Sequence, residues 1–157
     1  MKTISLHQPW AYLLCAGIKD IENRTWKLPE KYLGERVLIH ASAKEVRYFN
    51  DILNIDQLHA VLVDHESFSM FRSKLQYGAI IGSVEIVDCV VNHPSIWAEK
   101  STPIELDEFG FPIKYDKKIY NWVVEDPILF EKPILDVKGR LRFWDYELPE
   151  EYVELLK

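Results

Sequence analysis

The sequence contains few of the residues that mark specialised classes of protein. Its two cysteines, Cys15 and Cys89, form no C-x-x-C pair, so neither a disulfide framework nor a structural zinc site is expected, and a reducing, cytoplasmic setting is the default. No apolar run approaches the roughly 20 residues of a membrane-spanning helix. Residues 1–5 carry no signal-peptide core. We therefore expect a soluble protein with no membrane partner, no metal and no cofactor.

A basic surface of the kind that follows a long phosphate backbone is also missing. The net charge is −6, and residues 1–78 hold 10 Lys and Arg against 9 Asp and Glu, whereas residues 79–157 hold 9 against 16. We therefore do not expect long duplex nucleic acid as a partner. A role with single-stranded RNA would have to use a local pocket in the first half, and the alternative is a nucleotide-like small molecule as the ligand. The sequence does not fix the oligomeric state.

What the chain does contain is typical of one globular domain. Its 157 residues are 48% hydrophobic and 28% charged, close to globular averages. A chain of this length buries roughly 68–70% of its unfolded surface, which is enough for a core of its own. We expect residues 1–157 to form a single domain.

Strands and helices do not alternate regularly in the predicted order, which disfavours a doubly wound parallel sheet. The pattern instead favours an α+β fold, with a small, mixed, strongly curved sheet or barrel and helices packed around it. Alternation, capping signals and turn residues predict these elements. The predicted strands span 3–6, 20–26, 36–41, 78–91, 120–130 and 140–146, and the predicted helices span 9–16, 43–53, 56–63, 67–76 and 150–156.

Three features of this pattern are specific enough to be checked individually. Ser42 and Glu45 have the spacing of a capping box, which predicts a helix beginning at Ala43. The long strand at 78–91 is expected to bend or bulge at Gly82. The polar stretch at 92–118 is expected to be a long loop, partly ordered by its aromatic residues.

The segment between residues 17 and 26 concentrates charge next to tryptophan. Side chains alternate in an extended segment, so Glu22, Arg24 and Trp26 share one face, and a turn at Gly17 would bring Lys19 onto it. A carboxylate, a guanidinium and an ammonium beside an aromatic ring suit a planar polar ligand. The alternative is a surface cluster of ion pairs, each contributing about 0–1 kcal/mol.

The spacing Gly17-x-Lys19-x-x-Glu22-x-Arg24 resembles the GxKxxExR signature of the ASCH domain family, named for activating signal cointegrator homology. The segments around it resemble the same family in the same order, over nearly the whole chain. The resemblance implies a PUA-like β-barrel, similar to RNA-binding and RNA-modification domains. It also implies a cleft, lined by the signature, that binds RNA or a modified nucleotide or nucleoside. The resembling segments are Gln8–Ala11, Ile39–Ser42, Gly78–Cys89, Asn121–Val123 and Pro133–Trp144.

The resemblance leaves the question of catalysis open. One branch of the family hydrolyses N4-acetylcytidine with the signature Lys, a Thr in the position matching Glu22 and a distant Glu, and another has been described as a metal-dependent ribonuclease. Glu22 replaces the Thr here, and Thr25 has the opposite parity. If the chain is a hydrolase, Lys19 would be the base or electrostatic group and Glu22 its acid/base partner. A protein-interaction module that uses the acidic second half is a third alternative.

Other candidates for the cleft are weighed against structural roles. Trp26 is the better candidate for stacking on a base, whereas Trp10 is more simply a core residue. His40 either contacts the ligand or is a hydrogen-bonded core histidine. Ser42 would open a helix whose N-terminus, with Lys44, could hold an anion. The expected ligand-binding residues are Gln8, Trp10, Lys19, Glu22, Arg24, Trp26, His40, Ser42 and Lys44.

The role of Glu22 allows two outcomes for its replacement by Gln. A partly exposed site residue would change stability by less than about 1 kcal/mol. A buried ion pair that loses Glu22 would cost about 3–5 kcal/mol, because a charge is left uncompensated. The sequence favours the first outcome.

Overall fold

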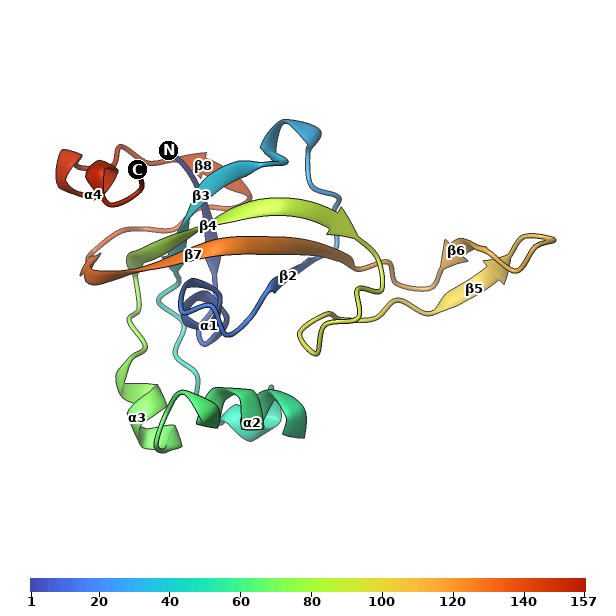
Figure 1. Cartoon of the computed structure of the whole chain (residues 1–157), viewed down its shortest axis with the longest axis horizontal. Coiled ribbons are helices and arrows are strands. Elements are labelled where there is room, and N and C mark those ends of the chain that lie inside the picture. Colours follow the sequence, from blue (N-terminus) through green and yellow to red (C-terminus); the bar gives the residue numbers. More distant parts are fainter.

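The computed structural model describes all 157 residues and is built on a curled six-stranded sheet (Figure 1). The strand order is β2-β7-β4-β3-β1-β8, in which β1 and β3 run parallel and the other neighbours antiparallel. The sheet forms a half-barrel, so the predicted curved α+β fold is confirmed. Its strands are β1 (Lys2–Leu6), β2 (Ile21–Arg24), β3 (Glu35–Ala41), β4 (Ala79–Val90), β7 (Tyr120–Ile134) and β8 (Phe143–Asp145).

The helices lie outside this sheet, except for α1 (Trp10–Cys15), which packs against it and supplies five buried residues to the main core. None of the helices is long and apolar enough to cross a membrane. Gly17 ends α1 at a φ of 75°, as predicted, and this turn leads directly into β2. The remaining helices are α2 (Ile55–Val63), α3 (Phe68–Ser73) and α4 (Glu150–Glu154).

The half-barrel remains open along a seam between its end strands, β2 and β8, which do not pair. Side chains bridge this seam. The Arg24 guanidinium donates from Nη2 to the Ser5 carbonyl at 3.2 Å. Phe143 stacks on Trp122 with ring centroids 5.6 Å apart, and Trp26 packs edge-on against both rings. The open seam is where the signature residues lie.

The predicted helix at 43–53 is wrong, and a short 3-10 turn at Phe49–Asp51 is the only helical structure there. The expected cap is used elsewhere, because Ser42 Oγ is hydrogen-bonded to His7 Nδ1 at 2.6 Å. Arg72 donates to the carbonyls of Val46 and Arg47 at 2.7 Å each. Those carbonyls therefore find a partner outside the segment. Tertiary contacts here outweigh the capping signal.

The stretch at 92–118 contains a hairpin that sequence reasoning missed. Strands β5 (Pro103–Leu106) and β6 (Pro112–Tyr115) pair with each other and project away from the main sheet (Figure 1). The turn is formed by Asp107, whose carboxylate accepts from the N–H groups of Phe109 and Phe111, and by Gly110 at a φ of 86°. The sequence Asp-Glu-Phe-Gly between two short apolar runs was the available signal.

The predicted irregularity at Gly82 is confirmed, since β4 shifts register against β7 between Ile80 and Gly82. A Cβ at Gly82 would lie 2.1 Å from the Ile128 carbonyl oxygen and 2.9 Å from Cys15 Sγ. The position therefore has no room for a side chain.

We expect Gly82→Ala to lower the free energy of unfolding by 3 kcal/mol or more, at or above the upper end of the range of about 1–3 kcal/mol for overpacking. Urea unfolding followed by far-UV circular dichroism measures this loss. Gly110→Ala is the control, because its Cβ meets open space and only its positive φ is costly, by about 1–2 kcal/mol. Equal losses in the two variants would contradict the steric explanation.

Candidate functional site

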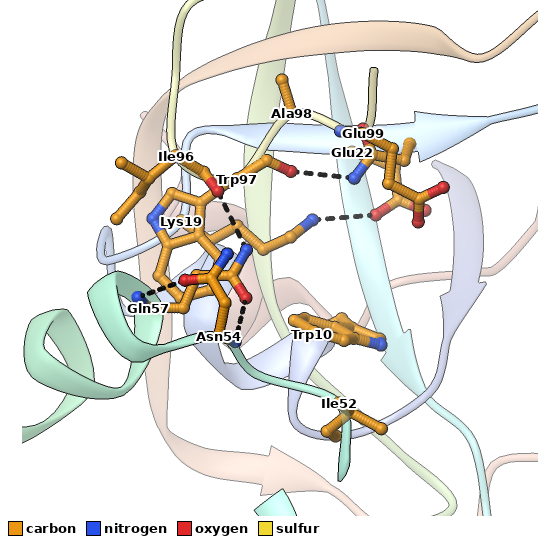
Figure 2. Close-up of a pocket in the computed structure, with 11 residues that line it drawn as sticks. Trp10, Lys19, Glu22, Ile52, Asn54, Gln57, Ile96, Trp97, Ala98 and Glu99 are labelled. Atoms are coloured by element: carbon orange, nitrogen blue, oxygen red, sulfur yellow. Dashed lines mark hydrogen bonds and ion pairs between the residues drawn. The ribbon is translucent and has the colours of Figure 1, made fainter. Parts of the chain in front are cut away.

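The three charged residues of the signature converge on one point of the seam. Lys19 Nζ lies 3.5 Å from Glu22 Oε2, and Arg24 Nε lies 2.8 Å from Glu22 Oε1. Figure 2 shows the Lys19 ammonium directed at the Glu22 carboxylate, with Trp10 beside them. The turn after α1 and the alternation of β2 bring the groups together, as the extended segment predicts.

Burial sets the electrostatics of this cluster. Lys19 is 4% exposed and Glu22 is 8% exposed. Burial lowers the pKa of Lys19, while the Glu22 carboxylate opposes that shift. The Lys19 ammonium also donates to the Ile21 carbonyl. The alternative of a solvent-exposed ion-pair cluster is therefore wrong, and the cluster is part of the scaffold as well as of the cleft.

Arg24 is held less completely than Lys19. Its Nε lies close to Glu22 but has no aligned hydrogen bond, and Nη2 contacts the Ser5 carbonyl. The guanidinium carbon lies 5.9 Å from the centroid of the Trp122 ring, within the range of a cation–π contact. Arg24 is half-buried, so the rest of its guanidinium edge faces the cleft.

On one side of the cluster lies a hollow of about 390 Å³, which we call the amide half of the cleft. Asn23 connects its walls: the side chain donates to the Trp97 carbonyl at 2.9 Å and accepts from the Glu99 N–H at 3.0 Å and from Asn121 at 2.9 Å. The contacts to Trp97 and Glu99 fix the loop 95–99 over β2. The lining residues are Trp10, Lys19, Glu22, Asn23, Ile52, Asn54, Gln57, Ile96, Trp97, Ala98 and Glu99.

Sequence reasoning missed most of this half. The stretch 92–118 was expected to be ordered by its aromatic residues, and one of them, Trp97, is buried and also lines the hollow. The available signal for Asn23 was its place between Glu22 and Arg24. Its pairing opposite Asn121 could not be read without the sheet register.

On the other side of the cluster lies a hollow of about 620 Å³, which we call the cationic half. Arg24 and three side chains of the segment 138–142 face it, and Glu22 is the one carboxylate in its lining. The expectation that a local pocket would draw on the first half alone is therefore wrong. The acidic second half supplies most of the positive charge, through Lys138, Arg140 and Arg142.

Trp10 lies between the two halves of the cleft. It lines both of them and is only partly buried, with its ring 6.5 Å from that of Trp97 and 5.6 Å from Lys19 Nζ. Trp26 lines neither half, because it packs on Trp122 and Phe143. The expected assignment of these two tryptophans is therefore reversed: Trp10 is the ring available for stacking, and Trp26 belongs to the core.

The remaining predicted residues divide between the cleft and the scaffold. His40 and Ser42 line the cationic half, although His40 is only 1% exposed. Gln8 is buried, and its amide donates to the Gln76 carbonyl and accepts from the Tyr12 N–H, so it has a structural role. Lys44 is exposed and lies outside both halves, and no helix begins beside it, so the expected helix-terminal anion site is wrong.

No group of three or more His, Cys, Asp or Glu side chains in the chain is placed to hold a metal ion. The residues that line the cleft offer stacking, ion pairing and hydrogen bonding. Glu22 and Glu99 provide acceptor oxygens in the amide half, and the cationic half provides donors.

Comparisons with known proteins show the family to which the chain belongs. The family model of the ASCH domain matches residues 4–134, and the chain therefore belongs to the ASCH domain family. The crystal structure of ASCH from Zymomonas mobilis superposes with a TM-score of 0.52 at 16% identity, covering 99% of this chain and 92% of that one, which shows a shared fold.

Two curated relatives also match. Activating signal cointegrator 1 of Homo sapiens is 28% identical over 130 residues, covering 74% of this chain and 21% of that protein. Activating signal cointegrator 1 of Mus musculus is 30% identical over 87 residues, covering 55% of this chain and 14% of that protein. This chain thus spans about a fifth, or less, of the length of these relatives.

The burial of Lys19 and Glu22 overturns the expectation that replacing Glu22 costs less than about 1 kcal/mol. We expect Glu22→Gln to destabilise the fold by about 3–5 kcal/mol near neutral pH, because it leaves the buried Lys19 charge uncompensated. The deficit should shrink as the pH rises towards 10.5, the ordinary lysine value. At pH values between the lowered pKa of Lys19 in the folded chain and 10.5, the unfolded chain binds more protons than the folded chain. The free energy of unfolding therefore rises with pH over this range. The Glu22 carboxylate raises the pKa of Lys19, so in Glu22→Gln the rise in stability begins at a lower pH.

Urea melts of the wild type and of Glu22→Gln at a series of pH values measure this difference. Glu45→Gln removes the same charge from an exposed position and serves as the control. A loss below about 1 kcal/mol, the range of exposed pairs, would show that Glu22 does not hold a buried charge.

Proposed function

We propose that this chain binds RNA or a modified nucleotide or nucleoside in the cleft on either side of the Lys19–Glu22–Arg24 cluster. One observation carries the proposal: a partly exposed Trp10 ring lies between a hollow with acceptor oxygens and a hollow with cationic donors. A nucleotide has the matching parts, a flat base with polar edges and an anionic phosphate. Base stacking on aromatic rings is a common mode of single-strand recognition.

The amide half suits the base. Glu99 is exposed and its carboxylate has no partner in the structure, while Glu22 keeps free lone pairs beyond its two cations. Carboxylates accept hydrogen bonds from exocyclic amino groups such as N4 of cytosine. Asn23, whose amide holds the loop 95–99 by donating to the Trp97 carbonyl and accepting from the Glu99 N–H, acts as a positioning residue.

A hydrolase acting on the same ligand is the second candidate. Its supporting observation is that Lys19, a buried lysine with a lowered pKa, lies beside a carboxylate in a cleft, an arrangement frequent in active sites. Lys19 would be the base or electrostatic group, and Glu22 its acid/base partner. The hydroxyl nucleophile of the amidohydrolase branch has no counterpart, since Thr25 is exposed and lines neither half. Incubation with N4-acetylcytidine and with short RNAs, followed by mass spectrometry, distinguishes turnover from binding.

We expect Trp10→Ala to weaken binding of a fluorescein-labelled, ten-nucleotide single-stranded RNA of mixed sequence by about 5- to 150-fold. This range corresponds to the roughly 1–3 kcal/mol of one base stacked on an aromatic ring. Fluorescence anisotropy measures the affinity. Phe109→Ala removes an exposed aromatic ring from the hairpin tip and is the control. If Phe109→Ala lost affinity and Trp10→Ala did not, the RNA site would lie on the hairpin.

The same assay gives the salt dependence of binding. Four cations face the cationic half, so three or four phosphate contacts would give a slope of log affinity against log salt of about −2 to −3, at roughly −0.7 per contact on a single strand. A slope steeper than about −5 would require a basic surface outside the cleft.

A further inference from the structure

We infer that the cationic half is a phosphate-binding subsite, formed by the segment Val137–Arg142, and that the chain prefers phosphorylated ligands to nucleosides. We call this segment the phosphate loop. The inference rests on the proposed function, because it assigns the second half of the same cleft. Three independent features of the loop support it.

The first feature is unpaired charge. The chain has a net charge of −6, yet four Lys and Arg side chains face this hollow against one carboxylate. Lys138, Arg140 and Arg142 are exposed, and none of them forms an ion pair or donates a hydrogen bond within the chain. A cluster of cations without protein acceptors is complementary to an anion that the protein does not supply.

The second feature is the anchoring of the loop on a buried histidine. His40 Nε2 lies 2.8 Å from the Val137 carbonyl, and because a carbonyl can only accept, Nε2 carries the proton. In the neutral ring, which burial favours by lowering the His40 pKa, Nδ1 then accepts from the Ser5 hydroxyl at 3.1 Å. The Ser5 hydroxyl in turn accepts from Trp144 Nε1. Each polar group in this series of hydrogen bonds has a partner, so the loop is held at a defined position.

Gly139 allows the loop to pack closely against His40 and Ser5. A Cβ at this position would lie 2.6 Å from His40 Cε1 and 2.8 Å from Ser5 Oγ, so only glycine allows the loop to approach so closely. The Val137 N–H also donates to the Gly78 carbonyl at 2.9 Å. The cations are therefore carried on a backbone fixed at both its glycine and its first residue.

The third feature is the position of two of the arginines next to aromatic rings. The Arg140 guanidinium lies 5.9 Å from the Trp144 ring centroid, and that of Arg142 lies 5.3 Å from the Trp26 ring centroid. A cation–π contact at this distance favours one position of the guanidinium, and no protein acceptor uses its N–H groups, which can therefore bind an anion. This gives Trp26 a role in the site through Arg142, although the ring does not line the cleft.

The two halves are close enough to be filled by one molecule, because they share Trp10, Glu22 and Asn23 in their linings. A base stacked on Trp10 in the amide half would place its attached phosphate towards Arg24 and the phosphate loop. The structure thus assigns a direction to the ligand along the cleft.

The test uses the full chain, labelled with nitrogen-15 and titrated in heteronuclear NMR experiments at low salt. The probes are the four ribonucleosides, the four ribonucleoside 5′-monophosphates and inorganic phosphate. For the wild type we expect at least one monophosphate to bind tenfold or more tightly than its nucleoside. In the double variant Lys138→Gln/Arg140→Gln this preference should disappear, while nucleoside binding stays unchanged.

The control is Lys114→Gln/Lys117→Gln, which removes the same net charge from exposed positions on and next to β6. With the ten-nucleotide RNA, the loop variant should reduce the salt slope by about 1.4, two contacts at 0.7 each, and the control should not. Equal binding of nucleosides and monophosphates by the wild type, or equal losses in both double variants, would overturn the phosphate subsite.

Failure of the proposed function has a different signature. If no nucleoside, nucleotide or RNA bound to the wild type, the proposed function would be wrong whatever the loop does. Binding of inorganic phosphate alone, abolished in the loop variant and kept in the control, would then support an anion site without a nucleotide.

Discussion

The carboxylate of Glu22, placed between the ammonium of Lys19 and the guanidinium of Arg24, is the interaction on which this molecule depends. Lys19 follows α1, Glu22 and Arg24 lie on β2, and Arg24 continues the contact to the Ser5 carbonyl on β1. The buried Glu22 carboxylate thus links the end of α1 to β2 and, through Arg24, to β1 across the open seam of the sheet. The hydrogen bonds of a closed barrel are replaced at this seam by side-chain contacts, and the opening that they leave is the cleft.

The distribution of charge shows why bulk composition is a poor guide to a small site. An acidic chain can still concentrate positive charge locally, because folding brings Arg24 and the phosphate loop to one rim while the Asp and Glu side chains are spread elsewhere. Glu22 belongs to both halves of the cleft, so the same carboxylate neutralises Lys19 on one side and limits the excess of cations on the other. The cleft therefore offers acceptor oxygens at one end and cationic donors at the other.

Local patterns in the sequence predicted the main strands, the turn at Gly17 and the convergence of the signature, because each depends on neighbours within a few residues. The failures share a different cause. The helix expected at 43–53 is replaced because His7 and Arg72 bind its polar groups from distant parts of the chain. The exchange of roles between Trp10 and Trp26, and the arrival of Lys138 and Arg140 at the cleft, depend on how the sheet curls. Contacts between remote segments decide all of these, and no periodicity within one segment encodes them.

The hairpin of β5 and β6 is separated from the cleft by a clasp at its base. Asn92 and Ser101 exchange two hydrogen bonds, and the Ser101 hydroxyl contacts both the N–H and the carbonyl of Ile119. The loop 95–99, which rims the amide half, lies on one side of this clasp, and the hairpin lies on the other. The chain therefore carries an interchangeable appendage. Because these hydrogen bonds lie between the hairpin and the cleft, a grafted peptide or a reporter group at the tip is expected to leave the geometry of the cleft unchanged.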